Sequence, residues 1–149
     1  MTATSNAAFA DPWRQLWNGD LAQLDALVAK DFIAHAALMG GTGEGTLRGR
    51  AALGQWIGGL HAVMIGLTFS IEVGPVTDAD HLVVRWRARG TYRGGLPGAS
   101  DAAIGREVNF IGTDILRVAN GRIAEYWVNS DTLLLVQQLG VEGMSGATA

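Results

Sequence analysis

The chain has 149 residues, which suits a single domain that buries roughly two thirds of its unfolded surface. Hydrophobic residues make up 48% and charged residues only 17%, and the net charge of −3 offers no basic surface for nucleic acid. There is no apolar run near the ~18 residues of a membrane span, no signal-peptide pattern, and no cysteine for disulfides or thiol chemistry. We therefore expect one cytoplasmic domain over residues 1–149, ordered from about 9 to 141 with flexible ends, that binds neither nucleic acid nor membranes.

Helical spacing of apolar residues predicts three helices in the first half of the chain, over residues 11–17, 21–30 and 50–64. The first begins at Asp11-Pro12, an N-cap followed by proline at the first helical position. Between the second and third helices, residues 31–35 lead into a segment at 40–45 that is too rich in glycine for regular structure. The first half is therefore predicted to be mainly helical.

The second half is predicted to be β-rich, with strands over residues 67–76, 81–92, 106–118 and 122–131 and a closing helix over 132–139. Residues 81–92 alternate strictly, so the face that carries Val83 and Arg85 should be polar, and the face that carries Leu82 and Trp86 should be core. Helices followed by an antiparallel run of strands give an α+β layout. A curved sheet wrapped around the helices would enclose a cone whose mouth both kinds of element line.

The stretch from 112 to 140 organises this layout, because Asn120-Gly121 between two apolar runs is a strong signal for a two-residue hairpin turn. The register that follows pairs Ala119 with Arg122, Asp114 with Trp127, and Phe110 with Asp131. Because Cβ atoms alternate across a strand, one apolar face of the hairpin should then carry three clustered polar groups, Asp114, Asn129 and Asp131. This arrangement predicts a pocket, although a one-residue bulge would reverse the orientation.

The sequence contains no motif for a metal, a nucleotide or a covalent nucleophile. The three histidines, His35, His61 and His81, have no metal-ligand spacing. An HExxH motif, a glycine-rich phosphate loop and a GxSxG elbow are all absent. We therefore predict chemistry without metal or cofactor, on a small-molecule substrate or ligand.

Asp131 is the leading candidate for acid/base chemistry. At the end of a strand near Phe110 and Trp127, its carboxylate would lose hydration and its pKa would rise toward neutrality, as a general base requires. The alternative is that Asp131 only caps the closing helix. Asp114 would be a second carboxylate on the same face.

His35 and the tryptophans complete the candidate site. His35 is either a half-buried side chain bonded to backbone or a proton donor to a substrate carbonyl, since the pKa of free histidine is about 6.5. Tryptophans are usually core residues, but several that converge on one cavity suit a flat aromatic ligand. The candidate substrate-binding residues on these grounds are Trp13, Trp17, Trp56, Trp86, Phe110, Asp114, Trp127 and Asn129.

The segment Gly121-Arg122-Ile123-x-Glu125-x-Trp127-x-x-x-Asp131, followed by Gln138-Leu139-Gly140, resembles the C-terminal half of the SnoaL-like polyketide cyclases, in the nuclear transport factor 2-like superfamily. Weaker matches to the same family are Phe32-x-x-His35, Gly49-Arg50, Gly90-Thr91 and Gly105-Arg106. The resemblance covers about residues 10 to 140.

The resemblance implies a cone-shaped α+β barrel with a deep apolar pocket, in a homo-oligomer such as a dimer or tetramer. Characterised cyclases of this family close a polyketide ring by intramolecular aldol condensation, without metal or cofactor, and use an aspartate as acid/base. The match implies that Asp131 is this aspartate and His35 its partner. Related sequences often have histidine after Gly-Thr where this chain has Tyr92, a phenol that can hydrogen-bond a carbonyl but cannot share a proton near pH 7.

We therefore expect a cofactor-free acid/base enzyme, an aldol-type cyclase or isomerase, that acts on a carbonyl-containing polyketide-like or aromatic molecule. Asp131 would abstract a proton, and His35 with Asn129 or Tyr92 would polarise the carbonyl. The alternatives are a non-catalytic binding protein for an apolar molecule, a cofactor-free hydroxylase of the same family, and a protein whose only property is oligomerisation. Epoxide-hydrolase chemistry is disfavoured, because residues 81–92 contain no carboxylate.

Overall fold

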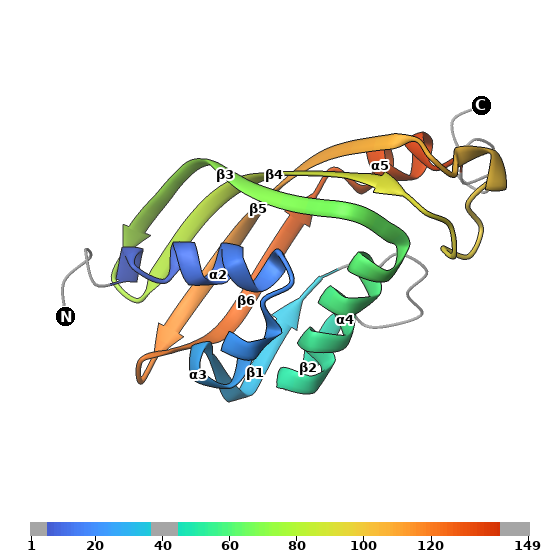
Figure 1. Cartoon of the computed structure of the whole chain (residues 1–149). Helices are drawn as coiled ribbons and strands as arrows, with labels where there is room; N and C mark the ends of the chain where they lie inside the picture. Colours follow the sequence, from blue (N-terminus) through green and yellow to red (C-terminus); the bar gives the residue numbers. More distant parts are fainter. Residues whose placement is uncertain (1–5, 37–44, 141–149) are drawn as a thin grey trace.

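The computed structural model describes residues 6–36 and 45–140, in which helices lie against a curved six-stranded sheet (Figure 1). The helices are α2 (Ala10–Trp17), α3 (Leu24–Leu27), α4 (Arg50–Val63) and α5 (Thr132–Gln138), with short 3-10 turns at Leu21–Gln23 and Asp101–Ala103. The strands are β1 (Val28–His35), β2 (Thr46–Arg48), β3 (Met64–Asp78), β4 (His81–Tyr92), β5 (Glu107–Ala119) and β6 (Arg122–Ser130). Of the predicted glycine-rich segment, residues 40–44 lie outside the described part of the chain. None of the described helices is long and apolar enough to cross a membrane.

The strand order is β2-β1-β6-β5-β4-β3, and all neighbours are antiparallel except β1 and β6, which are parallel. The predicted α+β class, with a curved and mainly antiparallel sheet around N-terminal helices, is confirmed. The sheet is open and does not close into a barrel, because β2 and β3 are its two edges. Figure 1 shows α2 and α4 on the same side of the sheet, which is its inner face.

The second predicted helix is wrong beyond Leu27, because the chain turns there into β1. The apolar residues up to Val28 keep helical spacing, so the change of structure leaves no mark in the pattern. A register shift against β6 between Val28 and Ile33 also breaks the alternation that would indicate a strand. β1 and β2 therefore add two strands to the four that were predicted.

The predicted hairpin turn between β5 and β6 is confirmed. Asn120 and Gly121 have φ values of 53° and 74°, and Ala119 pairs with Arg122. Both turn residues thus take the left-handed conformation that a two-residue hairpin requires.

The register predicted beyond this turn is wrong, because a bulge at Ala124 adds one residue to β6. Asp114 therefore lies opposite Val128 and not opposite Trp127. The inner face of β5 is as predicted, but the faces of β6 are exchanged beyond the bulge, whereas Ile123 before it stays on the inner face. Tyr126 is buried on the inner side, and Trp127 lies on the outer side.

The alternation predicted for β4 is confirmed. Leu82, Val84 and Trp86 are buried, whereas Arg85 and Arg89 are exposed on the opposite face. The inner face of the sheet and the apolar sides of α2 and α4 together form the core.

Candidate active site

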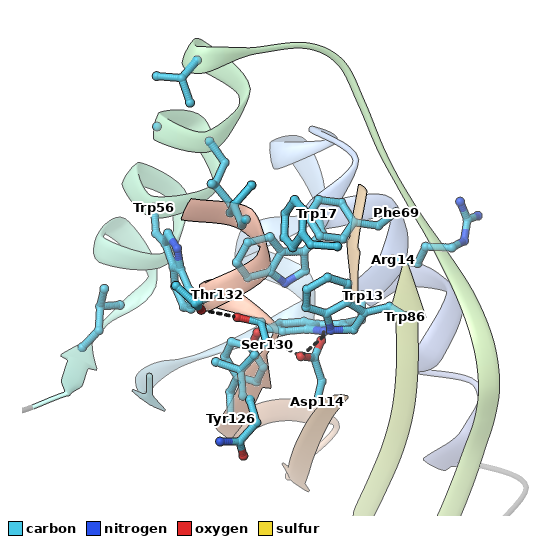
Figure 2. A pocket seen from close by; sticks show the side chains of 18 of the residues that line it. Trp13, Arg14, Trp17, Trp56, Phe69, Trp86, Asp114, Tyr126, Ser130 and Thr132 are labelled. Carbon is cyan, nitrogen blue, oxygen red and sulfur yellow. Dashed lines mark hydrogen bonds between the residues drawn. The ribbon is translucent and has the colours of Figure 1, made fainter. Parts of the chain in front are cut away.

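A cavity of about 650 Å³ lies between the inner face of the sheet and the helices α2 and α4 (Figure 2). Small-molecule sites have volumes of ~300–1,000 Å³, so this cavity is large enough for a ligand. Its wall is mainly aromatic and aliphatic, and its polar groups are one buried carboxylate and a set of side chains at the rim. The aromatic and polar lining residues include Trp13, Trp17, Trp56, Phe69, Trp86, Phe110, Asp114, Tyr126, Asn129, Ser130 and Thr132.

Asp114, in the middle of β5, is the buried carboxylate and is only 3% exposed. Its Oδ1 accepts hydrogen bonds from Trp86 Nε1 at 2.8 Å and from the Tyr126 hydroxyl at 3.1 Å. Its Oδ2 accepts a hydrogen bond from Trp13 Nε1 at 2.9 Å. Figure 2 shows these side chains converging on Asp114 from different elements. Three uncharged donors, from α2, β4 and β6, therefore hold one carboxylate at the cavity.

Burial raises the pKa of Asp114 from 3.8 to about 6, because the ionised carboxylate loses its hydration. The three hydrogen bonds act in the opposite direction, since each stabilises the ionised form. Burial and the neighbouring Asp114 raise the pKa of Tyr126 well above its usual value of 10.0. Asp114 can therefore gain or lose a proton near neutral pH, while Tyr126 stays a neutral donor.

Gly112 makes room for the indole that reaches Asp114 from β4. Trp86 pairs with Gly112 across the two strands. A Cβ added to Gly112 would lie 2.2 Å from Cζ2 of Trp86, so any larger residue would displace the ring. Trp86 also packs edge-on against Phe69 and Phe110, with ring centroids 5.3 and 5.7 Å apart. The direction of its N–H group is therefore fixed by packing.

The remaining wall of the cavity is a continuous aromatic cluster. Trp13 packs on Tyr126 with ring centroids 4.9 Å apart, and Trp17 meets Trp56 at 5.0 Å with an interplanar angle of 90°. Trp13 and Trp17 are 6.0 Å apart on successive turns of α2. Such a wall suits a flat apolar ligand.

The rim of the cavity is polar where β6 passes into α5. The hydroxyl groups of Ser130 and Thr132 hydrogen-bond to each other at 3.0 Å, as Figure 2 shows. Asn129 is exposed beside them. Arg14, on the α2 side, is paired with Asp11 at 2.7 Å. A ligand would therefore meet polar groups at its outer end and aromatic rings along its body.

Most of the predicted substrate-binding residues do line this cavity, and whether they contact a ligand stays a prediction. They are Trp13, Trp17, Trp56, Trp86, Phe110, Asp114 and Asn129. Tyr92 does not line it. Its hydroxyl accepts a hydrogen bond from the backbone N–H of Leu96 at 3.0 Å, and so fixes the loop that brings Leu96 to the cavity.

The two predicted catalytic residues and Trp127 also lie away from the cavity lining. Asp131 is exposed, and its Oδ1 accepts a hydrogen bond from the backbone N–H of Leu134 at 3.3 Å as the N-cap of α5. His35 lies on the outer face of the sheet, 2.7 Å from Glu125 and stacked on Trp127 at 5.4 Å. The predicted meeting of Asp131 and His35 in the pocket is wrong. The bulge in β6 reverses its faces, and the helix cap occupies the Asp131 carboxylate.

Tyr126 is a site residue that the sequence pattern does not indicate. Tyr126 and Trp127 are adjacent, so only one of them can face inward, and alternation alone does not say which. The bulge at Ala124 decides it, and nothing in the sequence marks that bulge. Ser130, which follows the same bulge in β6, was missed for the same reason.

Within residues 6–36 and 45–140, no group of three or more histidine, aspartate and glutamate side chains is arranged to hold a metal ion. The groups around Asp114 are hydrogen-bond donors and not further ligands.

The family model for the SnoaL-like domain matches residues 8–126. The chain belongs to the SnoaL-like domain family. The resemblance inferred from the sequence is therefore confirmed. The matched region contains Asp114 and all three of its donors, and it ends before Asp131.

Solved structures share the SnoaL-like fold over nearly the whole chain. IdmH of Streptomyces antibioticus, a candidate polyketide cyclase, is 28% identical with a TM-score of 0.77, over 91% of this chain and 99% of IdmH. TsrD of Streptomyces laurentii is 21% identical with a TM-score of 0.78, over 95% and 98%. AclR of Streptomyces galilaeus, a candidate hydroxylase, is 18% identical with a TM-score of 0.77, over 93% and 98%. Among curated proteins, none matches the chain.

Proposed function

We propose that this SnoaL-like protein is an acid/base enzyme that moves a proton on a carbon atom next to a carbonyl group, in a flat and mainly apolar small molecule. Asp114 is the proposed base, and after it has taken the proton it is the acid. The observation that carries the proposal is the buried carboxylate on the cavity, with a pKa raised to about 6 and three uncharged donors around it.

The pKa of Asp114 suits proton transfer in both directions. At pH 7 a carboxylate whose pKa is about 6 is roughly nine-tenths ionised, so it is ready to accept a proton. Once protonated it is still a competent acid near neutrality, because its pKa lies close to the working pH. An exposed aspartate would hold too little of the acid form to return the proton efficiently.

The hydrogen-bond pattern favours Oδ2 of Asp114 as the reacting atom. Oδ1 already accepts two hydrogen bonds, whereas Oδ2 accepts only the one from Trp13. Each carboxylate oxygen has about two acceptor sites, so Oδ2 keeps one for the proton of the substrate. The three donors hold the carboxylate in one orientation and lose no proton themselves at neutral pH.

The reaction class that we propose is intramolecular aldol closure. Asp114 removes a proton from a carbon next to one carbonyl, and the resulting enolate carbon forms a bond to a second carbonyl carbon of the same molecule. The new alkoxide oxygen then takes the proton back from Asp114, so that atoms and electrons balance. The likeness to IdmH, a candidate polyketide cyclase, supports this class. Isomerisation, in which the proton returns to a different carbon, uses the same machinery.

This proposal replaces Asp131 by Asp114 as the base. Asp131 caps α5 and His35 pairs with Glu125 on the outer face, so neither is near the proposed reaction. A catalytic role for them stays a prediction, and the experiment below tests it for Asp131. The expected homo-oligomer likewise stays a prediction, for light scattering to test.

Proton transfer can be measured without the natural substrate. 2-Tetralone is a bicyclic ketone with acidic hydrogens next to its carbonyl, and NMR in D2O follows their replacement by deuterium. We expect the wild-type protein to accelerate this exchange, and Asp114→Asn to lower the acceleration by roughly 100-fold or more.

Asp131→Asn is the matched control, because it makes the same change in a carboxylate outside the cavity. It should keep the wild-type exchange rate within a small factor. Circular dichroism would show that both variants are folded. Loss of exchange in Asp131→Asn with full activity in Asp114→Asn would overturn the proposal and restore Asp131 as the base.

Ligand binding without catalysis is a second candidate, favoured by the aromatic cluster of Trp13, Trp17 and Trp56. These rings would hold a flat ligand whatever the state of Asp114. A wild-type protein that binds 2-tetralone but does not accelerate exchange on either side of pH 6 would support this second function.

A further inference from the structure

Trp17 belongs to the cavity wall, and its buried indole N–H has no hydrogen-bond partner among residues 6–36 and 45–140. We propose that it donates a hydrogen bond to the carbonyl oxygen of the bound substrate, an inference that rests on the proposed function. Trp17 would then be the residue that stabilises the negative charge on this oxygen while Asp114 holds the proton. The substrate must accordingly carry a hydrogen-bond acceptor, and not only an apolar body.

Trp17 ends α2 and is 6% exposed. In the part of the chain that the structure describes, only two buried side-chain polar atoms lack a hydrogen-bond partner, Trp17 Nε1 and Asn6 Oδ1. The Asn6 amide is anchored to the turn after β3 through its other end, by a bond to the carbonyl of Ala79. Of these two unpaired atoms, only the one in Trp17 belongs to a residue of the cavity wall.

A buried N–H without a partner is costly, at about 1–3 kcal/mol, and native proteins contain few of them. The contrast with the neighbouring indoles is direct. Trp13 and Trp86 line the same cavity, and both donate to Asp114. Trp17 packs on Trp13, yet its own N–H is left over. An oxygen atom of a ligand would satisfy it.

Elimination among the other donors also leads to Trp17. The tyrosine hydroxyl and the indoles of Trp13 and Trp86 are occupied by Asp114, and the hydroxyl groups of Ser130 and Thr132 bond to each other at the exposed rim. The other lining donors are less enclosed, because Trp56 is only half-buried and Gln55 and Asn129 are exposed. Of the residues that the sequence suggested for polarising the carbonyl, His35 and Tyr92 do not line the cavity, and Asn129 lines it only at the exposed rim. Trp17 therefore supplies a buried donor that is free to meet a substrate oxygen.

The chemistry follows from what an indole can and cannot do. When Asp114 takes the proton from the carbon atom, the electron pair moves onto the carbonyl oxygen, and the hydrogen bond to that oxygen strengthens. The indole keeps its own proton throughout, so the bond stabilises charge without a second proton transfer. A donor fixed in an apolar wall needs no reorganisation at this step.

The competing explanation is a contact with a neighbouring ring. Trp17 and Trp56 are perpendicular at 5.0 Å, an arrangement in which an N–H can point at an aromatic face. The two explanations predict different responses of the Trp17 N–H to a bound ligand. A donor reserved for the substrate responds to an oxygen atom in the ligand, whereas a donor directed at a ring responds only to the presence of a ligand.

The decisive measurement is the indole N–H resonance of Trp17 in 15N-labelled protein, assigned by its absence in Trp17→Phe. The probes are 2-tetralone and tetralin, which share a carbon skeleton but differ in the ketone oxygen. We expect the resonance to move downfield with 2-tetralone and not with tetralin. Equal movement with both probes, or no movement with 2-tetralone while other cavity resonances shift, would overturn the proposal.

Affinities give an independent test that does not depend on assignment. Trp17→Phe should weaken 2-tetralone binding by roughly tenfold more than tetralin binding, because only the ketone loses a hydrogen bond. Phe69→Leu is the control on the same wall, because Phe69 packs on Trp17 and carries no donor, and it should weaken both probes alike. A loss in Trp17→Phe that is equal for the two probes would mean packing alone.

Failure of this inference is distinguishable from failure of the proposed function. If Asp114 is not the base, Asp114→Asn keeps the exchange rate, yet Trp17 still responds to the ketone. If Trp17 does not bind the oxygen, its resonance ignores the ketone, yet exchange still depends on Asp114.

Discussion

The β5–β6 hairpin carries a carboxylate on each of its faces, and the two have opposite surroundings. Asp114 on the inner face is buried and meets only uncharged donors, and burial raises its pKa to about 6. Glu125 on the outer face lies 2.7 Å from the His35 imidazole and 3.1 Å from the Arg117 guanidinium. The hydrogen bond from His35, followed by the bond and charge of Arg117, lowers the pKa of Glu125.

The comparison shows that burial away from any positive charge, and not the number of hydrogen bonds, decides whether a carboxylate can act as a base and an acid near neutral pH. Each carboxylate has at least two side-chain partners. The hydrogen bond from His35 and the bond and charge of Arg117 keep Glu125 ionised at neutral pH, so it has no proton to return. Asp114 lies among uncharged partners in an apolar wall. Its protonated and ionised forms therefore differ little in free energy at neutral pH.

The largest effect is expected from Gly112→Ala, which damages the inner face without touching a titrating group. The new Cβ would overlap the ring of Trp86, which must move and release Asp114. We expect a loss of about 3 kcal/mol in unfolding free energy, the upper end for overpacking, and a large loss of 2-tetralone exchange. Urea unfolding and the exchange assay measure both.

The control for this change is Gly58→Ala in α4, where an added Cβ meets nothing within 4 Å. It should stabilise the protein by up to about 1 kcal/mol, because alanine is the better helix former. Full stability and full exchange in Gly112→Ala would show that Trp86 is not held as described.

The next effect is a pH dependence of stability that comes from Asp114. Its pKa is near 3.8 in the unfolded chain and about 6 in the folded one, so between these values only the folded chain holds the proton. The contribution of Asp114 to the free energy of unfolding is therefore fully present below about pH 4 and is lost as the pH rises through 6. At pH 7 the loss amounts to about 3 kcal/mol.

The variant Asp114→Asn has no titratable group at this position. The unfolding free energy of this variant minus that of the wild type should therefore increase by about 2–3 kcal/mol from pH 4 to pH 7. Urea unfolding at a series of pH values gives the difference. A difference that stays flat would mean that Asp114 titrates as an ordinary aspartate.

A smaller effect is expected from Tyr126→Phe, which removes one neutral donor from Asp114. The hydroxyl stabilises the ionised carboxylate, so its loss should raise the pKa of Asp114 further. The rising limb of the pH profile for exchange should move to higher pH, with a lower rate at pH 6 and an unchanged plateau above it. Tyr92→Phe removes a hydroxyl outside the cavity and should leave the profile where it is.

The smallest effect is expected from Glu125→Gln. The pH dependence of stability that comes from Glu125 has the opposite sign to that from Asp114. The pKa of Glu125 is lowered on folding, so its stabilisation is present above the usual pKa of 4.5 and is lost as the pH falls through the folded value. The wild type should lose stability relative to Glu125→Gln on acidification, by less than about 1 kcal/mol because the pair is partly exposed. The same slope as for Asp114→Asn would refute the contrast between the two faces.

Local signals in the sequence predicted much of the fold. Asn120-Gly121 predicted the hairpin because only a few residue types adopt the conformation of its turn. The alternation of β4 predicted that the strand face with Trp86 is buried. The helical stripe with Trp13 and Trp17 predicted α2. Each of these features depends on residues that are close in the chain, so a pattern can reveal it.

The site itself was only half predictable, because it depends on one bulge and on distant contacts. A single extra residue at Ala124 moves Trp127 outward and brings Tyr126 to Asp114, and no glycine or proline marks it. The bond from Trp13 to Asp114 joins residues 101 positions apart, which no local pattern can indicate. Asp131 was preferred because it ends a strand, and the same position suits it to cap the following helix.

The contact between α2 and Asp114 also means that the carboxylate acquires its raised pKa only when the fold is complete. The hairpin that bears Asp114 is formed from the C-terminal third of the chain, whereas the indole of Trp13 that covers it comes from the first helix. Without that helix in place, Asp114 would be wetted by solvent and would titrate like any surface aspartate. Transient detachment of α2 would therefore inactivate the site while leaving the sheet intact. The pKa of Asp114 consequently measures how stably the N-terminal helix packs on the sheet.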